Sequence, residues 1–554
     1  MPAQRITHWW IVLSLLFTAC GTQPAVPPAP VGPLVAVQVS ERMLTRPRSC
    51  PNVFVTQTLP YTTTVHSEPI HLFESNGSGV ALGDLDGDGQ LDIVFANLAG
   101  ADTILWNQGG LNFRPELLDD TDSRAVNMVD VDGDNRLDIV FTHRMAGLSY
   151  WHNSGSAVGQ THFVRQSLPG VLHPAYAMAW GDLNGDNALD LVTGSYDAEL
   201  NQALGSTFLF SDGAGVYYYE QHHGMFVEQR LAKEAQALTI LLPDLNADGH
   251  PDILVGNDFD RQDAAWVHES NTWLAAQPFA ATAHSTMSYD QGDIDNSGAL
   301  AIISTDMKPY DIAVHTLAQW LPIMNTMPET HNPGDLQTMS NALQMRNARG
   351  QFTNQASARG LDATGWSWSS EFGDLDNDGF LDFYVVNGMI AFELFHYLPN
   401  DELVEQNQAL RNQSDGTFVP APQWQLGSTA SGRGMSMADL DNDGDLDIVV
   451  NNLRSPAQLF ENQLCSGSSL EVELAWPRSR NTRALGAQLV LHTSTGNYLR
   501  DIRAGSGYLS GDPPRIHFGF PTTSTLQRLD IRWPDGAVSH IDQLVAQTWL
   551  TIQR

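Results

Sequence analysis

The sequence predicts an all-β protein, a seven-bladed β-propeller followed by a small C-terminal β-sandwich domain. Three observations support this fold class. A nine-residue Asp-rich motif recurs seven times in the 554 residues, short apolar runs flank its copies, and residues 470–554 divide into short strand-like stretches.

The repeated motif reads Asp-x-Asp/Asn-x-Asp-Gly/Asn-x-Leu-Asp. Its spacing is irregular, so insertions of different lengths separate the repeats. A linear β-solenoid is the rival architecture, but its repeats are shorter and more regular. The copies stand at 84–92, 130–138, 182–190, 244–252, 374–382 and 439–447, with a weaker copy at 293–301.

Each copy lies between two stretches that predict strands. The stretch ahead is apolar or alternating, as at 79–82, and the stretch behind is β-branched, as at 93–95. Continuous apolar strands of this kind are buried on both faces of a sheet. A further strand and a hairpin follow in several repeats, as at 105–113 and 345–352. Several short strands per repeat are typical of a propeller blade.

The motif also carries the chemistry of a calcium site. Positions 1, 3, 5 and 9 bear side-chain oxygens, and the backbone carbonyl of position 7 can complete the shell. Hard oxygen ligands in this number select Ca²⁺, whereas Mg²⁺ prefers fewer protein ligands in strict octahedral geometry. Position 6 is Gly in five copies and Asn in two, the residue types that tolerate the positive φ of a tight curl. The recurrence of these features disfavours plain solvated turns.

The expected ligands are positions 1, 3, 5, 7 and 9 of the six full copies and the first three oxygen-bearing positions of the weak copy. They are Asp84, Asp86, Asp88, Gln90, Asp92, Asp130, Asp132, Asp134, Arg136, Asp138, Asp182, Asn184, Asp186, Ala188, Asp190, Asp244, Asn246, Asp248, His250, Asp252, Asp293, Asp295, Ser297, Asp374, Asp376, Asp378, Phe380, Asp382, Asp439, Asp441, Asp443, Asp445 and Asp447.

The weak copy has Ser297 at position 5 and Ala301 at position 9, so it is expected to bind calcium weakly or not at all. About six calcium sites and a degenerate seventh are therefore predicted. Clustered carboxylates repel one another without a cation, which favours a structural role for the calcium.

The N-terminus predicts export. Arg5 precedes an apolar run at 9–19 that is too short to span a bilayer, and small residues stand just before Cys20. This arrangement resembles the bacterial lipobox, which implies a signal peptide over 1–20 and a membrane lipoprotein anchored through Cys20. An ordinary secretory signal is the alternative. A Pro-rich tether is expected over 21–52, the propeller over 53–465 and the C-terminal domain over 466–554.

Two further cysteines flank the predicted propeller. Cys50 stands just before the first blade and Cys465 just after the last. A closed ring brings these positions together, and an exported protein meets an oxidising environment. A disulfide would then clasp the ring, and two free thiols are the alternative.

The chain is strongly acidic, with 63 Asp and Glu residues, 28 Lys and Arg residues and a formal charge of −35 at pH 7. This charge disfavours nucleic acid and anionic membrane surfaces as partners. The predicted calcium loops account for a large share of the carboxylates. The arginines of the C-terminal domain could dock onto those loops or bind an anionic ligand.

The motifs resemble those of a known family. The repeats look like the FG-GAP/VCBS-type calcium repeats of integrin-like propellers. The C-terminal segment carries Gly486-Ala487, RAGSGYLS at 503–510, His517-Phe518-Gly519 and RWPDG at 532–536, and WSWS stands at 366–369. These motifs resemble the ASPIC/UnbV domain and the cartilage acidic protein family. The resemblance implies a secreted or surface calcium-binding protein and brings no catalytic residues with it.

The residues assemble no recognisable catalytic site, since a nucleophile elbow, a phosphate-binding Gly loop and a His-rich metal pattern are all missing from the sequence. Two functions stay open. The first is a monomeric, non-enzymatic scaffold for adhesion or binding, with an extracellular or periplasmic protein or glycan as partner. The second is a polysaccharide-active hydrolase or lyase with its site in the central funnel or the insertion at 306–341. Tryptophans of the blades either pack between sheets or form a carbohydrate platform; they are Trp106, Trp151, Trp266 and Trp320.

Overall fold

The computed structural model describes residues 32–45, 49–155, 158–205, 214–270, 272–326 and 335–554. The signal peptide expected over 1–20 and the lipidated Cys20 lie outside these residues and stay predictions. Strands and loops make up nearly all of the described chain, so the predicted all-β class is confirmed. None of the helices in these ranges has the length and apolar character needed to cross a bilayer.

Seven sheets of the described residues form the propeller, each built mainly from four antiparallel strands in order along the chain. Blades 1 to 4 contain β3 (Val80–Gly83), β4 (Asp92–Phe95), β5 (Thr103–Asn107), β6 (Phe113–Leu117), β7 (Ser123–Val129), β8 (Asp138–His143), β9 (Ser149–Asn153), β10 (Phe163–Gln166), β11 (Ala177–Gly181), β12 (Asp190–Gly194), β13 (Val216–His222), β14 (Met225–Ala232), β15 (Ala237–Leu241), β16 (Ile253–Asn257), β17 (Ala264–Glu269) and β18 (Thr272–Ala276).

The next two sheets carry the longer insertions, and the last one closes the ring. Blades 5 to 7 contain β20 (Ser288–Gly292), β21 (Ala301–Thr305), β24 (Ala342–Arg346), β25 (Phe352–Asn354), β22 (Met307–Lys308), β26 (Gly365–Gly373), β27 (Asp382–Asn387), β30 (Gln408–Asn412), β31 (Phe418–Pro420), β32 (Gly432–Ala438), β33 (Asp447–Asn452), β34 (Pro456–Gln463) and β2 (Val53–Thr62).

The inner strands show that the ring is closed. Each of them contacts the inner strand of the next blade, in the order β3, β7, β11, β15, β20, β26, β32 and back to β3. Blade 7 combines the two ends of the propeller, because β2 pairs antiparallel with β34 from Val53–Gln463 onward. The predicted propeller architecture is therefore confirmed, and the solenoid alternative is excluded.

Cys50 and Cys465 meet at this closure. The structure joins them in a disulfide with their Cα atoms 5.5 Å apart. Of the two alternatives left open by the sequence, the structure therefore contains the bonded pair, which links the start of β2 to the end of β34.

The apolar runs of the sequence form strands that are buried within the blades. Every residue of β3, β4 and β8 is buried, whereas the outermost strand β6 is mostly exposed. The four tryptophans considered as a carbohydrate platform are each at most 8% exposed, so they pack in the interior. These residues are Trp106, Trp151, Trp266 and Trp320.

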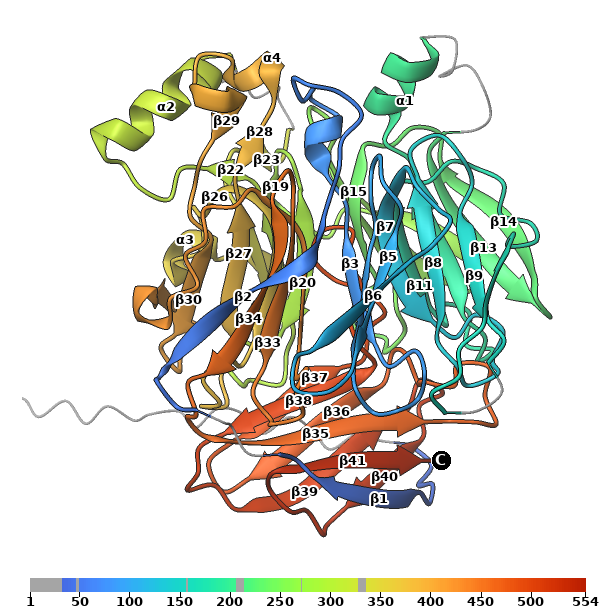
Figure 1. Ribbon diagram of the computed structural model, residues 1–554. Coiled ribbons are helices and arrows are strands. Elements are labelled where there is room, and N and C mark those ends of the chain that lie inside the picture. Colours follow the sequence, from blue (N-terminus) through green and yellow to red (C-terminus); the bar gives the residue numbers. More distant parts are fainter. Residues whose placement is uncertain (1–31, 46–48, 156–157, 206–213, 271, 327–334) are drawn as a thin grey trace, which may run out of the picture.

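Two four-stranded sheets form the C-terminal sandwich, which lies against one end of the propeller (Figure 1). The first sheet contains β1 (Gln38–Met43), β41 (Thr548–Gln553), β35 (Ser468–Ala475) and β38 (Arg515–Phe520). The second contains β37 (Asn497–Asp501), β36 (Gln488–Thr493), β39 (Leu526–Arg532) and β40 (Val538–Ile541).

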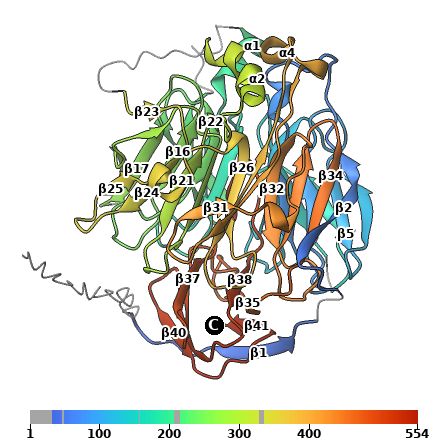
Figure 2. The same ribbon diagram turned by 90° about the vertical axis from the view of Figure 1, so that its left-hand side faces the viewer.

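The tether expected over 21–52 needs a correction within its described part. Residues Gln38–Met43 form β1, an edge strand that pairs antiparallel with β41 (Figure 2). All six residues are exposed, so their pattern carries no apolar face that could have revealed a strand. The chain thus crosses the C-terminal domain before it enters the propeller.

Helices and short pairs decorate the opposite end of the propeller, where α1, α2 and α4 lie (Figure 1). The insertion at 306–341 contains α2. The helices, turns and short strand pairs outside the blades and the sandwich are α1 (Asp197–Leu204), α2 (Val314–Met324), α3 (Ala356–Arg359), α4 (Phe392–Phe395), the 3-10 turns η1 (Glu74–Asn76), η3 (Pro399–Asp401) and η4 (Pro422–Trp424), and the strand pairs β19 (Thr282–Ala283) with β23 (Gln337–Thr338) and β28 (Met389–Ile390) with β29 (Glu402–Leu403). Of these, α3 lies at the side of the propeller beside β30 (Figure 1).

A loop of the sandwich, residues 503–512, fills the centre of the propeller; we call it the axial loop. Its backbone bonds inner strands around the ring, with Gly511 N donating to Val80 O at 2.9 Å and Gly507 N donating to Tyr289 O at 2.8 Å. On another side, Tyr508 N donates to Ser369 Oγ at 3.0 Å. The funnel proposed for an enzyme site is therefore occupied by the chain itself.

Candidate metal centres

The seven Asp-rich loops share one hydrogen-bonded curl. In each loop the carboxylate at position 1 accepts the backbone N–H groups of positions 5 and 6. In the first loop, Asp84 Oδ1 lies 3.1 Å from Asp88 N and Asp84 Oδ2 lies 2.9 Å from Gly89 N. The first aspartate thus holds the curl in which the other side chains are placed.

The curl needs left-handed backbone at two positions. Position 6 has a positive φ in all seven loops, as its Gly and Asn residues predict. Position 4 also has a positive φ in all seven, which the sequence reasoning missed. The overlooked residues are Gly87, Gly133, Gly185, Ala247, Asn296, Asn377 and Asn442. Six of the seven are Gly or Asn, so the same signal as at position 6 was available, and only Ala247 departs from it.

The carboxylate at position 9 ties each loop to its own blade. Asp92 Oδ2 accepts Leu85 N at 3.1 Å, and Asp92 Oδ1 accepts Asn107 N from the third strand at 2.9 Å. The same two bonds recur in every copy that has Asp at position 9. The weak copy has Ala301 there and lacks the carboxylate.

Carboxylate oxygens converge in four of the loops. In these loops, oxygens of positions 1, 3 and 9 lie within 4.8 Å of one another. The third and fourth loops have Asn184 and Asn246 at position 3, so each has an amide in place of one carboxylate. The converging triads are Asp84, Asp86 and Asp92; Asp130, Asp132 and Asp138; Asp374, Asp376 and Asp382; and Asp439, Asp441 and Asp447.

Positions 5 and 7 have a different local role. The position-5 carboxylate accepts the N–H of position 7, as between Asp88 Oδ1 and Gln90 N at 2.8 Å. It is not a member of the four triads. Ligation by the carbonyls of position 7 stays a prediction, which concerns Gln90, Arg136, Ala188, His250, Phe380 and Asp445.

Burial makes these carboxylates costly to ionise without a cation. Burial, with smaller contributions from Asp86 and Asp84, raises the pKa of Asp92 to about 8. Burial likewise raises the pKa of Asp138 and of Asp190 to about 7. A divalent cation favours the ionised form, so it offsets both the burial and the mutual repulsion. The oxygen-only triads fit a hard cation such as Ca²⁺.

In four of the seven blades an asparagine of the third strand links the loop to the preceding blade, and the sequence reasoning missed it. Asn107 Nδ2 donates to Leu91 O of its own blade at 3.1 Å and to Leu440 O of blade 7 at 2.8 Å. The counterparts are Asn153, Asn412 and Asn462. The available signal was an Asn at the end of these third-strand stretches, such as LWN or YWHN. We call these residues the staple asparagines.

The loops face the C-terminal sandwich. Five position-6 carbonyls contact it: Gly89 O with Arg515, Asn135 O with Arg483, Asn187 O with Asn481, Gly249 O with Arg532, and Gly444 O with His517. An ion pair of 2.6 Å between Arg503 and Asp290 of β20 adds to this interface. Of the two roles considered for the C-terminal arginines, the contacts of Arg483 and Arg503 agree with docking.

A groove of about 520 Å³ lies between blades 3 to 5 and the sandwich. Its apolar surface includes Leu242, Phe352 and Trp533. Its charged groups have both signs and are Arg346, Arg503, Arg532, Asp182, Asp244 and Asp501. A volume between about 300 and 1,000 Å³ with an apolar surface and a few polar groups is typical of a ligand site.

Sequence comparisons agree with this architecture. Residues 84–141, 130–193 and 398–450 match the FG-GAP-like repeat, and residues 477–554 match the family described as ASPIC and UnbV. The chain therefore carries FG-GAP-like repeats in its β-propeller and a C-terminal segment that matches the ASPIC and UnbV family.

Its relatives include cartilage acidic protein 1. The chain is 38% identical to the protein of Mus musculus over 111 residues, which cover 19% of this chain and 17% of that protein. For the Homo sapiens protein the identity is 37% over 111 residues, covering 19% and 16%. The match thus spans about one sixth of the length of these relatives.

Solved structures give weaker likenesses. The BP39L lectin from Burkholderia pseudomallei has a TM-score of 0.41 at 10% identity, with coverage of 68% of this chain and 93% of that chain. The Pan2 WD40 domain of Neurospora crassa has a TM-score of 0.38 at 8% identity, with coverage of 76% and 98%. No functional conclusion is drawn from scores this low.

Proposed function

We propose that this protein is an exported, calcium-binding scaffold for binding or adhesion. In this proposal a lipid on Cys20 tethers the protein to a bacterial membrane, on the periplasmic or cell-surface side, and the propeller binds protein or glycan partners without catalysis. In this proposal calcium has a structural role. It binds in about six loops, and the loop at 293–301 is degenerate.

One observation carries the calcium part of the proposal. Carboxylates of positions 1, 3 and 9 converge within 4.8 Å in four loops, and in three of these the position-6 carbonyl contacts the sandwich. A cation in such a loop screens the carboxylates and fixes the carbonyl that the sandwich contacts. Calcium binding and docking of the two domains are then coupled, because both depend on the same curl.

Calcium removal tests this coupling. Chelation by EDTA is expected to lower the melting temperature of the mature protein by many degrees, and added Ca²⁺ is expected to restore it. An unchanged melting temperature in EDTA contradicts a structural role for calcium.

A pair of matched variants tests the assignment of the loops. Asp86→Ala removes position 3 of the first loop and is expected to reduce the bound calcium, measured by equilibrium dialysis with metal analysis, by one ion. Asp295→Ala makes the same change in the degenerate loop and is expected to leave the count unchanged. Equal calcium counts for wild type and Asp86→Ala contradict the assignment.

The groove between propeller and sandwich is the proposed recognition surface. Arginines and aspartates beside an apolar surface suit a polar glycan or peptide. Glycan arrays and pull-down of peptides are expected to show calcium-dependent binding that Arg346→Ala weakens. Arg349→Ala, an exposed residue of the same hairpin, serves as the control. Binding that is equal in EDTA and unaffected by Arg346→Ala contradicts this surface.

Export is supported by the disulfide, because such bonds persist in oxidising compartments. Fractionation of bacterial cells tests the anchor. The wild-type chain is expected in the membrane fraction, and Cys20→Ser is expected to release it or to leave it unprocessed. Membrane association that survives Cys20→Ser with normal processing contradicts lipid anchoring.

A further inference from the structure

The third strand of a blade offers one more side chain to its loop, from the position just before the staple residue. In blade 6 this residue is Arg411, whose Nε lies 2.5 Å from Asp376 Oδ2 and whose Nη2 lies 3.0 Å from Asp378 Oδ2. In blade 3 the corresponding linking residue is Gln221, whose Nε2 donates to Val131 O of blade 2 at 2.9 Å. The residue before it is Glu220, which accepts Asn184 Nδ2 at 3.0 Å. The strand position therefore reaches the side chains at positions 3 and 5 of the loop.

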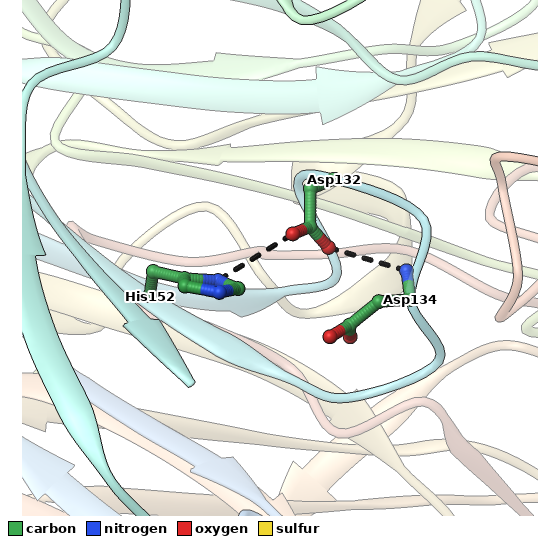
Figure 3. Close-up of side chains that lie close together, drawn as sticks. All are labelled: Asp132, Asp134 and His152. Carbon is green, nitrogen blue, oxygen red and sulfur yellow. Dashed lines mark hydrogen bonds and ion pairs between the residues drawn. The ribbon is translucent and has the colours of Figure 1, made fainter. Parts of the chain in front are cut away.

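Blade 2 carries an imidazole at this position. His152 Nδ1 lies 3.5 Å from Asp132 Oδ2 and 3.3 Å from Asp138 Oδ1. Ligand atoms of His152, Asp132 and Asp134 lie within 4.8 Å of one another (Figure 3). Among the described residues, this is the one such group that contains a nitrogen donor.

The position of the imidazole is determined by strand β9 and by the bond of that strand to the loop. His152 belongs to β9, and Asn153 beside it is held by the bond from its N–H to Asp138 Oδ1 at 2.8 Å. Tyr150 Oη lies 3.2 Å from His152 Nδ1, and the histidine side chain is 19% exposed. The ring is thus half-buried and directed at the loop. Asp132 is exposed, and Asp134 pairs with Arg136, which a bound cation would displace.

We infer that the second loop holds a transition-metal dication of the Zn²⁺ class through His152, Asp132 and Asp134, next to the triad of Asp130, Asp132 and Asp138. Asp132 belongs to both groups, so the two sites share an edge. Calcium takes oxygen ligands, whereas zinc and its neighbours bind imidazole together with carboxylates. The inference rests on the proposed function only in treating the loop as a cation site.

Zinc binding to the full-length mature protein saturated with calcium tests the inference. Isothermal titration is expected to show one Zn²⁺ bound per chain. X-ray absorption at the zinc edge is expected to show the scattering pattern of one imidazole among oxygen ligands.

Variants of His152 test whether its imidazole is a zinc ligand. His152→Ala is expected to weaken zinc binding by more than the roughly 10–100-fold that changes outside the ligand shell cause, and to remove the imidazole scattering. His152→Gln keeps a polar side chain of similar length and serves where the alanine variant folds poorly. His71→Ala is the matched control, because His71 pairs with the single carboxylate of Glu393 and belongs to no such group.

The outcomes separate this inference from the proposed function. Absence of zinc binding in the wild type overturns the inference, as does zinc binding of equal strength in the His152 variants. The number of bound calcium ions, measured in the same samples, tests the proposed calcium sites separately from the zinc site. Calcium bound without zinc leaves the proposed function standing alone, and zinc bound without calcium leaves the inference standing alone.

Discussion

The hydroxyl of Tyr508 in the C-terminal domain lies 2.9 Å from the hydroxyl of Tyr176 in the propeller. Both side chains are buried, and Tyr508 also donates to Asn76 O in η1 at 3.0 Å. Because η1 lies at the end of the propeller away from the sandwich (Figure 1), the axial loop reaches through the ring. The two domains are therefore held together along the axis as well as at the Asp-rich loops.

Truncation of this tyrosine is expected to be severely destabilising. Tyr508→Ala removes a buried ring that packs 5.1 Å from the Trp368 ring, and a loss of about 3–5 kcal/mol in the free energy of unfolding is expected. Tyr508→Phe removes only the hydroxyl and is expected to cost about 1–2 kcal/mol. Denaturant unfolding of the calcium-loaded protein measures both. Equal costs for the two variants contradict a packing role for the ring.

The disulfide is expected to stabilise the closed ring. Its two cysteines are 415 residues apart, so it restricts the unfolded chain strongly. Cys465→Ser is expected to lower the free energy of unfolding by about 2–4 kcal/mol, although pairing of β2 with β34 still closes the ring. Mass spectrometry of the mature wild type is expected to show no free thiol at Cys50 or Cys465. Two free thiols, or a variant as stable as the wild type, contradict the clasp.

A staple asparagine is expected to matter more than an ordinary hairpin asparagine. Asn153 Nδ2 donates to Leu85 O at 2.8 Å and to Leu137 O at 3.2 Å, and all three residues are buried. Asn153→Ala leaves both carbonyls unpaired, at about 1–3 kcal/mol each. Asn112→Ala is the control, since Asn112 is exposed and bonds only its own hairpin. Thermal unfolding of the two variants is expected to give a lower melting temperature for Asn153→Ala. Equal melting temperatures refute the linking role of Asn153.

Local features of the loops were predictable from sequence, because their physics is local. The side chain at position 1 bonds N–H groups four and five residues on, and the positive φ of position 6 follows from Gly and Asn. The flanking strands were equally clear, since β4 and β8 are apolar and fully buried. In each case residues close in the chain determine the structure.

The missed features depend on contacts between distant segments. The axial loop reads as a Gly-rich motif with no apolar periodicity, and its conformation follows from strands such as β3 and β20, which lie hundreds of residues away in the chain. Strand β1 is an exposed edge that forms because β41 offers a partner. The contact of Asn107 with blade 7 arises only once the ring closes. A single sequence carries no pattern for such contacts.

One buried carboxyl outside the Asp-rich loops, Glu405, is expected to contribute to the pH dependence of stability. Its Oε1 accepts Trp320 Nε1 of α2 at 3.1 Å, and its Oε2 accepts Trp366 N at 2.6 Å. Burial raises the pKa of Glu405 to about 7, even though both hydrogen bonds favour the ionised form. The folded state therefore holds the proton more tightly than the unfolded state, whose glutamate has an ordinary pKa near 4.5.

The sign of the effect follows from this difference. The stabilisation by protonated Glu405 is complete below about pH 4.5 and is lost as the pH rises through about 7, by an amount on the order of 3 kcal/mol. Glu405→Gln removes the titration. The free energy of unfolding of the wild type minus that of the variant is expected to fall between pH 4.5 and 7 and to stay level above pH 8. Denaturant unfolding of both proteins across this range, with calcium present, measures the difference, and parallel curves for the two proteins contradict the assignment.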